Sequence, residues 1–231
     1  MIHSGLPKIG MSRHLQLHHW SLFLVLVVAL LLPPAPAYAD SWALPVTRDY
    51  FSENRDFRFT VIPRELRSQL GYFSDKVTGR DPAGQLPGGA LAATGILSRR
   101  RADGSYNPVW QKTLSNDVAP VSAIVSPSGE YVVTFDNWHS MGYGRNVVVI
   151  YGPDGMVIRE FGLNDLLSTD ETERLPRTVS SIWWGRGHHF DESGKFLVLR
   201  IAANRKMPSD RDAQFRLLHI ELATGRVLTT G

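Results

Sequence analysis

The sequence of 231 residues contains no cysteine. Disulfide bonds are therefore excluded, and so is a lipid anchor on an amino-terminal cysteine. The chain must be stabilised by an ordinary hydrophobic core, and its length is sufficient to bury one. Export to an oxidising compartment would add no covalent cross-link to this fold.

A large excess of one charge is also lacking. Two basic residues, Lys8 and Arg13, precede Asp40, whereas all 22 acidic residues lie from Asp40 onward, which leaves a balance of +1 for residues 40–231. Such a balance gives no electrostatic support for nucleic-acid binding. The basic run at 99–101 is typical of the solvated end of a strand. We therefore expect no nucleic-acid partner.

Catalytic signatures are absent as well. The sequence has no HExxH pattern of a zinc protease, no GxSxG turn of a serine hydrolase and no phosphate-binding loop. Each of these patterns brings reactive groups together by local geometry. Without them, the sequence lacks the strongest indications of an enzyme. We assign no catalytic residue, no metal site and no cofactor.

Long hydrophobic segments are lacking too. The apolar run at 20–32, interrupted only by Ser21, has 13 residues, whereas a transmembrane helix needs about 20. It follows a weakly basic start and precedes a proline-rich segment that ends in a small-x-small pattern, the layout of a cleavable signal. We predict that residues 1–39 are removed and that an exported protein, periplasmic or extracellular, begins at Asp40. An uncleaved leader would instead give a membrane-tethered subunit of an envelope assembly.

A repeated strand pattern is the strongest feature that is present. Residues 121–161 show four short strands separated by turns, and a degraded copy occupies 179–231. Proline and glycine stand where tight turns favour them. The matching turns are 126–129 (Ser-Pro-Ser-Gly) with 191–194, and 153–155 (Pro-Asp-Gly) with 223–225. Because 179–182 matches 121–124, we expect residues 183–189 to be an insertion after the first strand of the last copy.

The earlier part of the chain fits the same template less closely. The segments 52–60 and 102–106 match its strands and turns, and 57–61 alternates apolar and polar residues. We therefore predict one all-β domain over 40–231. It would contain three units of four strands, at about 40–118, 119–170 and 178–231. Between the strands, we expect a long surface loop at 64–89 with one helical turn at 65–70, and a short helix at 164–167 capped by Asn164.

The segments SPSGEYVVTF and IYGPDGMVIREF resemble the blades of periplasmic Tol-associated and related WD40-like β-propellers. The resemblance implies four-stranded antiparallel blade-like units, arranged as a partial β-propeller, with a β-sandwich as the alternative. Closed propellers have about four to eight blades. Three units would therefore form an open arc, or would pair as a homodimer into a six-bladed ring. The resemblance implies a fold and no activity.

Alternate connections of a blade lie on the same face, and the second-to-third connection is long in every unit: 64–89, 136–145 and 202–213. Loops on a rigid scaffold commonly carry binding sites. We therefore predict that this long-loop face binds a protein or a small polar ligand. The candidate binding residues are Asp136, Asn137, Trp138, His139 and Tyr143.

A second interpretation is a metal-dependent hydrolase that uses Asp136 and His139, because a histidine–carboxylate pair can hold a metal or move protons. The expected topology places His188 and His189 in a first-to-second connection on the opposite face, so they should not join His139. The favoured function is therefore non-enzymatic binding or scaffolding. Asp136 would then form turn contacts with backbone amides, and His139 would pack on Trp138.

Overall fold

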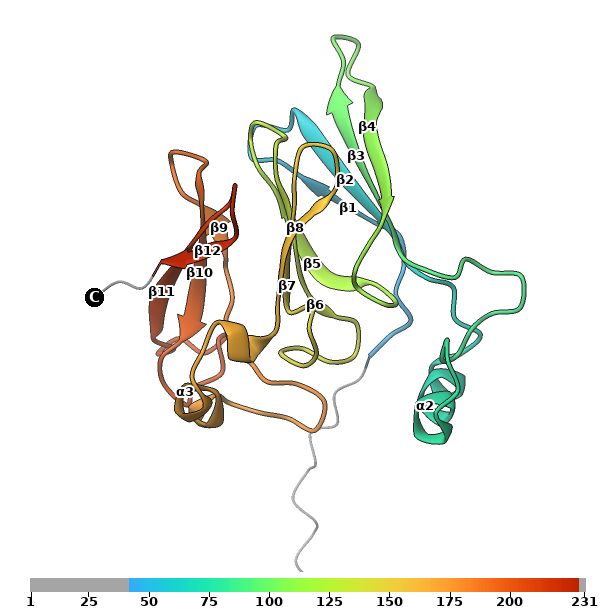
Figure 1. Cartoon of the computed structure of the whole chain (residues 1–231), viewed down its shortest axis with the longest axis vertical. Coiled ribbons are helices and arrows are strands. Elements are labelled where there is room, and N and C mark those ends of the chain that lie inside the picture. Colours follow the sequence, from blue (N-terminus) through green and yellow to red (C-terminus); the bar gives the residue numbers. More distant parts are fainter. Residues whose placement is uncertain (1–41, 229–231) are drawn as a thin grey trace, which may run out of the picture. The chain divides into compact units, whose positions relative to one another are not determined.

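The computed structural model describes residues 42–228, so the predicted signal peptide and its cleavage site lie outside the described residues. These residues form three four-stranded antiparallel sheets, each built from strands that are consecutive in sequence (Figure 1). The predicted all-β fold is confirmed. Within 42–228, no helix has the length and apolar character needed to cross a membrane.

The strands of each sheet follow one another in space as they do in the chain. The first sheet contains β1 (Arg48–Phe51), β2 (Phe57–Ile62), β3 (Thr94–Arg100) and β4 (Tyr106–Thr113). The second contains β5 (Pro120–Val125), β6 (Val132–Asn137), β7 (Val148–Tyr151) and β8 (Val157–Phe161). The third contains β9 (His189–Phe190), β10 (Phe196–Ala202), β11 (Phe215–Glu221) and β12 (Arg226–Leu228).

Strand β7 shows how the sheets pack. Its four side chains are all buried, and successive side chains of a strand point to opposite faces. Val148 and Ile150 belong to the core that the second sheet shares with the third, whereas Val149 and Tyr151 belong to the core shared with the first. The second sheet is therefore covered on both faces, and the structure has three layers of sheet with two hydrophobic cores between them.

The predicted turn at 126–129 is present, and it contains a glycine that the packing requires. The Gly129 amide donates to the Ser126 carbonyl at 2.9 Å, and Gly129 has a φ of +73°. A Cβ at Gly129 would lie 2.3 Å from Cε1 of Phe57. The equivalent glycine of the third sheet, Gly194, has a φ of +67° but open space around its Cβ position.

We expect Gly129→Ala to lower the free energy of unfolding by about 3 kcal/mol, because left-handed strain adds to displacement of the Phe57 ring. Gly194→Ala should lower it by only about 1 kcal/mol, because strain acts alone there. Urea denaturation of the two variants measures the difference. If both variants lost the same free energy of unfolding, the Phe57 contact would not contribute to the cost of Gly129→Ala.

The long connection after β2 differs from the expected surface loop. It contains helix α2 (Gln69–Thr78), whose first turn is capped by the Ser68 side chain accepting from the Gly71 amide, and which ends at Gly79. The prediction failed because the helix has no apolar stripe: Leu70 and Val77 are exposed, and only Tyr72 among its apolar residues is buried. Periodicity, the main signal for a helix, was therefore missing.

The connection after β8 also differs from the prediction of a helix at 164–167. It contains a single 3-10 turn, η1 (Leu163–Asp165), followed by α3 (Thr169–Arg174). The α3 helix begins with a capping box, in which Ser168 and Glu171 each accept from the other's backbone amide. The Ser-x-x-Glu pattern is the sequence signal that would have predicted this start.

The first strand of the third sheet was misplaced by the repeat alignment. Val179 is 90% exposed, whereas Gly185 forms a β-bridge with Ile201, and β9 pairs with Leu197 and Val198 of β10. The segment predicted as an insertion therefore runs along β10 as the first strand of this sheet. Gly185 and Gly187 interrupt the alternation of side chains, which hid the strand from the sequence pattern.

Candidate functional site

A cleft of about 580 Å³ lies at the long-loop end of the sheets, which is the lower end in Figure 1. Its walls come from α2, the segment before β5, the β6–β7 connection and Glu160 of β8. Four of the five predicted binding residues line it: Asn137, Trp138, His139 and Tyr143. The fifth, Asp136, lies beneath the surface and is 4% exposed.

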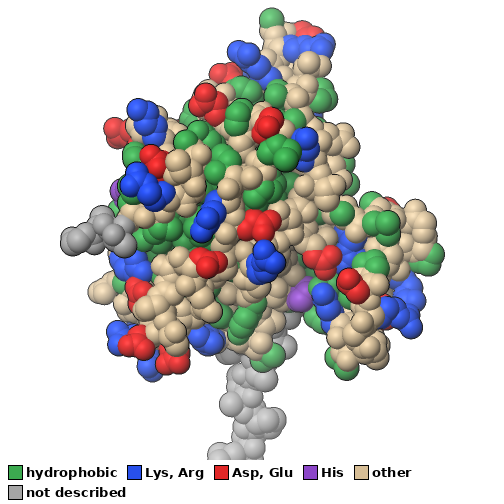
Figure 2. Space-filling model, in the orientation of Figure 1, with side chains coloured by type: hydrophobic (Ala, Val, Ile, Leu, Met, Phe, Trp, Pro, Cys, Tyr) green, Lys and Arg blue, Asp and Glu red, His purple; other side chains and the backbone are tan. Residues whose placement is uncertain are grey.

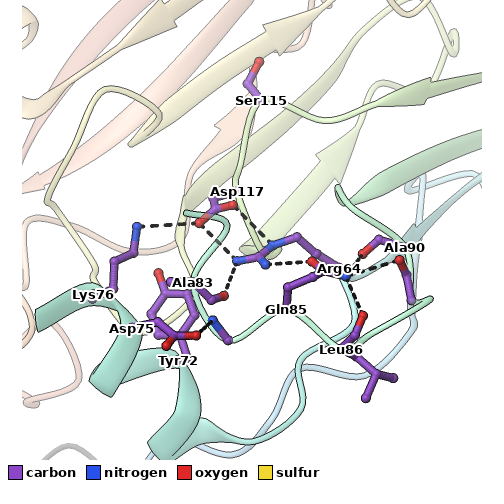
Figure 3. Close-up of polar contacts among 12 residues, drawn as sticks. Arg64, Tyr72, Asp75, Lys76, Ala83, Gln85, Leu86, Ala90, Ser115 and Asp117 are labelled. Carbon is purple, nitrogen blue, oxygen red and sulfur yellow. Dashed lines mark hydrogen bonds and ion pairs between the residues drawn. The ribbon is translucent and has the colours of Figure 1, made fainter. Parts of the chain in front are cut away.

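One wall of the cleft is anchored by Arg64, a residue expected in a surface loop that is in fact 1% exposed. Its guanidinium donates to Gln85 Oε1 at 3.1 Å, to the Ala83 carbonyl at 3.0 Å and to Asp117 Oδ2 at 3.4 Å (Figure 3). These contacts join the segment after α2 to the segment before β5. No local pattern marks Arg64, because its partners lie 19 to 53 positions away.

Helix α2 is held to the same framework and presents two side chains to the cleft. Asp75 Oδ2 accepts from the Gly84 amide at 2.9 Å, which closes the loop that follows the helix (Figure 3). On the neighbouring face, Lys76 Nζ lies 3.9 Å from Asp117 Oδ2. Lys76 and Tyr72 line the cleft.

The opposite wall is fixed to α2 by a contact between His139 and Tyr72. His139 Nε2 and the Tyr72 hydroxyl are 2.6 Å apart, and the His139 ring packs edge-on against Tyr72 and Trp138. Burial lowers the pKa of His139, and burial together with the nearby Asp117 raises the pKa of Tyr72 to about 12. Both groups are therefore neutral at physiological pH, and they join the walls as a neutral hydrogen-bonded pair.

The loop that carries Tyr143 is shaped by two buried or partly buried side chains. Asp136, at a φ of +58°, accepts from the Gly142 amide at 2.7 Å, and Asn137 Nδ2 donates to the Tyr143 carbonyl at 3.3 Å. Tyr143 remains 39% exposed between Gly142 and Gly144. Tyr143 is thus an exposed aromatic side chain on a fixed loop.

Asp136 also connects the second sheet to the third. Its Oδ1 accepts from Trp184 Nε1 at 2.9 Å, and Trp184 is fully buried in the core between these sheets. Burial raises the pKa of Asp136 to about 7, although the hydrogen bonds from Gly142 and Trp184 oppose the shift. The contacts of Asp136 are those of a structural residue that fixes the loop and the interface.

The histidines do not come together at the cleft. The His188 ring stacks on Trp184 and Phe135 at 4.5 and 4.7 Å, and its Nδ1 accepts from the Arg200 amide. His188 therefore lies beside β10 and not in a first-to-second turn, which corrects its predicted position, whereas His139 contacts α2. Within residues 42–228, no three His, Asp or Glu side chains are grouped as metal ligands.

The cleft continues past Tyr143 into a second cleft. Tyr143, Arg145 and Glu160 line both the first cleft and a neighbouring one of about 640 Å³ that extends toward η1. Acidic and basic side chains are interspersed over the face shown in Figure 2, without a region of single sign. The two clefts together offer an extended surface with charges of both signs and one exposed aromatic ring.

No family model and no curated protein sequence matches this chain. A proposal of function therefore rests on the residues of the cleft. Those that sequence reasoning missed are Tyr72, Lys76 and Asp117, which reach the cleft through α2 and the segment before β5.

Replacing Arg64 tests how the cleft wall is held. We expect Arg64→Leu to lower the free energy of unfolding by about 3 kcal/mol, because the Ala83 carbonyl and the Gln85 side chain lose their buried donor. Amides of α2 should also exchange hydrogen faster. Arg80→Leu, which removes an exposed partner of Asp75, should change stability by less than about 0.5 kcal/mol. Equal effects of the two substitutions would contradict the anchoring role of Arg64.

Proposed function

We propose that the protein is an exported, non-enzymatic binding protein that holds an extended segment of a partner polypeptide in the cleft between α2 and the β6–β7 connection. The three sheets would serve as blade-like units of a partial β-propeller that presents this cleft. The supporting observations are the consecutive strand order of each sheet and the cores between successive sheets.

A polypeptide fits the chemistry of the cleft better than a ligand of one charge. Lys76 and Arg145 provide positive charge, and Asp117 and Glu160 provide negative charge. Asn137 adds a side-chain amide, which can pair with peptide groups. The observation that carries the proposal is the continuity of this mixed surface past the exposed Tyr143 into the second cleft.

The cleft is also largely preformed. Its two walls are joined by the contact between His139 and Tyr72, and one wall is anchored by the buried Arg64. A preformed site avoids the cost of ordering loops on binding, which improves affinity for the same contacts. Exposed aromatic residues on such surfaces commonly contribute much of the binding energy.

The outer face of the first sheet supports the open, monomeric arrangement over a six-bladed homodimer. Arg58 lies 3.8 Å from Asp49 and stacks over Tyr106, and Thr60 also donates to Asp49. This polar network occupies part of the surface that a neighbouring blade would need, beside the exposed Phe51 and Ile62. Light scattering tests the arrangement: a monomer mass agrees with it, and a dimer mass favours the closed ring.

Selection from a displayed peptide library tests the proposed function. We expect the purified protein to enrich peptides that bind with micromolar affinity in fluorescence anisotropy. Tyr143→Ala should weaken their binding at least about tenfold, because it removes the exposed ring at the junction of the clefts. Met156→Ala, on the exposed β7–β8 turn, is the matched control and should bind as the wild type does. Peptides that bind equally well to both variants would contradict the proposal.

A further inference from the structure

We propose that a second site, between α3 and the beginning of the β10–β11 connection, binds a small organic carboxylate with an apolar tail. A cavity of about 390 Å³ lies there, within the size range of small-molecule sites. None of its lining residues belongs to the two clefts around Tyr143. The site is therefore separate from the polypeptide cleft.

The floor of this cavity is apolar. Leu167, Leu175 and Ile201 line it, and all three are buried members of the core shared by the second and third sheets. Their side chains are held in place by that core, so the floor is a fixed apolar surface. An apolar tail that covers it would be transferred out of water, which favours binding by roughly 25 cal/mol per Å² of apolar surface.

The rim of the cavity is basic. Three arginines line it, Arg174, Arg205 and Arg216, against a single acidic residue, Glu171. Arg216 Nη2 already contacts Glu171 Oε1 at 2.5 Å. Among residues 42–228, no partner engages the guanidinium groups of Arg174 and Arg205. Two positive charges are thus available at the mouth of an apolar cavity, and an anion would complement them.

Glu171 shows how a carboxylate is held at this rim. Its Oε1 accepts from Arg216, while its Oε2 accepts from the Ser168 amide at 2.8 Å. These hydrogen bonds and the charge of Arg216 lower the pKa of Glu171, so it is ionised at neutral pH. Figure 2 shows acidic and basic side chains side by side over the region that α3 occupies in Figure 1. Guanidinium groups favour carboxylates because their N–H groups match the two oxygens.

Octanoate is the probe for this site, with octanamide and acetate as matched controls. Titration into the isotope-labelled full chain should shift backbone resonances of 202–205 and of α3. Octanamide lacks the charge and acetate lacks the tail, so each should bind at least about tenfold more weakly. Octanamide binding as tightly as octanoate, or shifts confined to other parts of the chain, would overturn the proposal.

Three substitutions test the roles of the rim residues. Arg174→Gln and Arg205→Gln remove exposed charges, and each should weaken octanoate binding about three- to tenfold. Glu171→Gln keeps an acceptor for the Ser168 amide but releases Arg216, so it should strengthen binding about threefold. Arg99→Gln, on β3 of the first sheet, is the matched control and should leave the affinity unchanged. Unchanged affinity in both rim arginine variants would overturn the proposal.

Discussion

Trp184→Ala is expected to lower the free energy of unfolding by about 4 kcal/mol. The side chain is fully buried between the second and third sheets, and removal of a buried tryptophan leaves a large cavity. The substitution also deprives the buried Asp136 carboxyl of a donor and the His188 ring of a stacking partner. Because Trp184 contacts both of these groups, we expect its removal to destabilise the interface strongly.

Two further variants separate the loss of the buried ring from the loss of the N–H donor. Trp184→Phe retains most of the apolar ring but removes the N–H donor, and should cost about 2 kcal/mol. Trp183→Ala truncates the adjacent, partly buried ring and should cost clearly less than Trp184→Ala. Urea denaturation at pH 7 measures all three. A larger loss for Trp183→Ala than for Trp184→Ala would contradict the assignment of Trp184 as the core residue of the pair.

The second large effect concerns the pH dependence of stability at Asp136. Its pKa is raised from 3.8 to about 7 in the folded protein, so the unfolded chain releases this proton at lower pH than the folded one. The stabilisation that the Asp136 carboxyl contributes is therefore complete below about pH 4, and it is lost as the pH rises toward 7. Between pH 5 and pH 8 the loss amounts to about 2–3 kcal/mol.

His188 acts in the opposite direction. Burial, with Arg200 and His189 nearby, lowers its pKa from 6.5 to about 3, so the unfolded chain takes up a proton that the folded protein does not. Stability from this group is present above pH 6.5 and is lost as pH falls toward 3. Because the two effects nearly cancel between pH 5 and pH 8, the wild-type protein alone would conceal both.

A paired measurement with Asp136→Asn removes this cancellation. Asparagine retains an oxygen for Gly142 and Trp184 and tolerates the positive φ, but it carries no charge. We expect the variant to gain about 2–3 kcal/mol relative to the wild type as pH rises from 5 to 8. Denaturation series at both pH values give this difference. A difference that does not change with pH would contradict the raised pKa of Asp136.

The strands and tight turns could largely be predicted from the sequence because their signals are local. Alternating apolar residues mark β2 and β5, and the glycine of the Ser126–Pro–Ser–Gly129 turn adopts the positive φ that the turn requires. The first strand of the third sheet could not be predicted in this way, because Gly185 and Gly187 interrupt its alternation. The segment 179–182 matches 121–124 better in sequence, so the repeat comparison placed the first strand there, six residues before the bridged Gly185.

The candidate site was predictable only in part, for the same physical reason. The β6–β7 connection was identified by its polar and aromatic residues, and it does line the cleft. The other wall depends on Arg64, Tyr72 and Asp117, whose contacts join parts of the chain that are distant in sequence. Tyr72 reaches the cleft because α2 lies against the β6–β7 connection, where the Tyr72 ring contacts Trp138 and His139. The sequence gives no sign of this contact, because α2 lacks the apolar stripe that would have marked it as a helix.

Site-specific photo-cross-linking in the native host tests the binding role of the cleft most directly. A benzophenone amino acid at position 143 should capture a polypeptide partner, and the same group at position 156, on the opposite β7–β8 turn, should not. The captured band should also disappear when Lys76→Glu and Arg145→Glu are added, because both charges lie in the cleft. Equal capture from both positions, or none from position 143, would contradict a polypeptide-binding cleft.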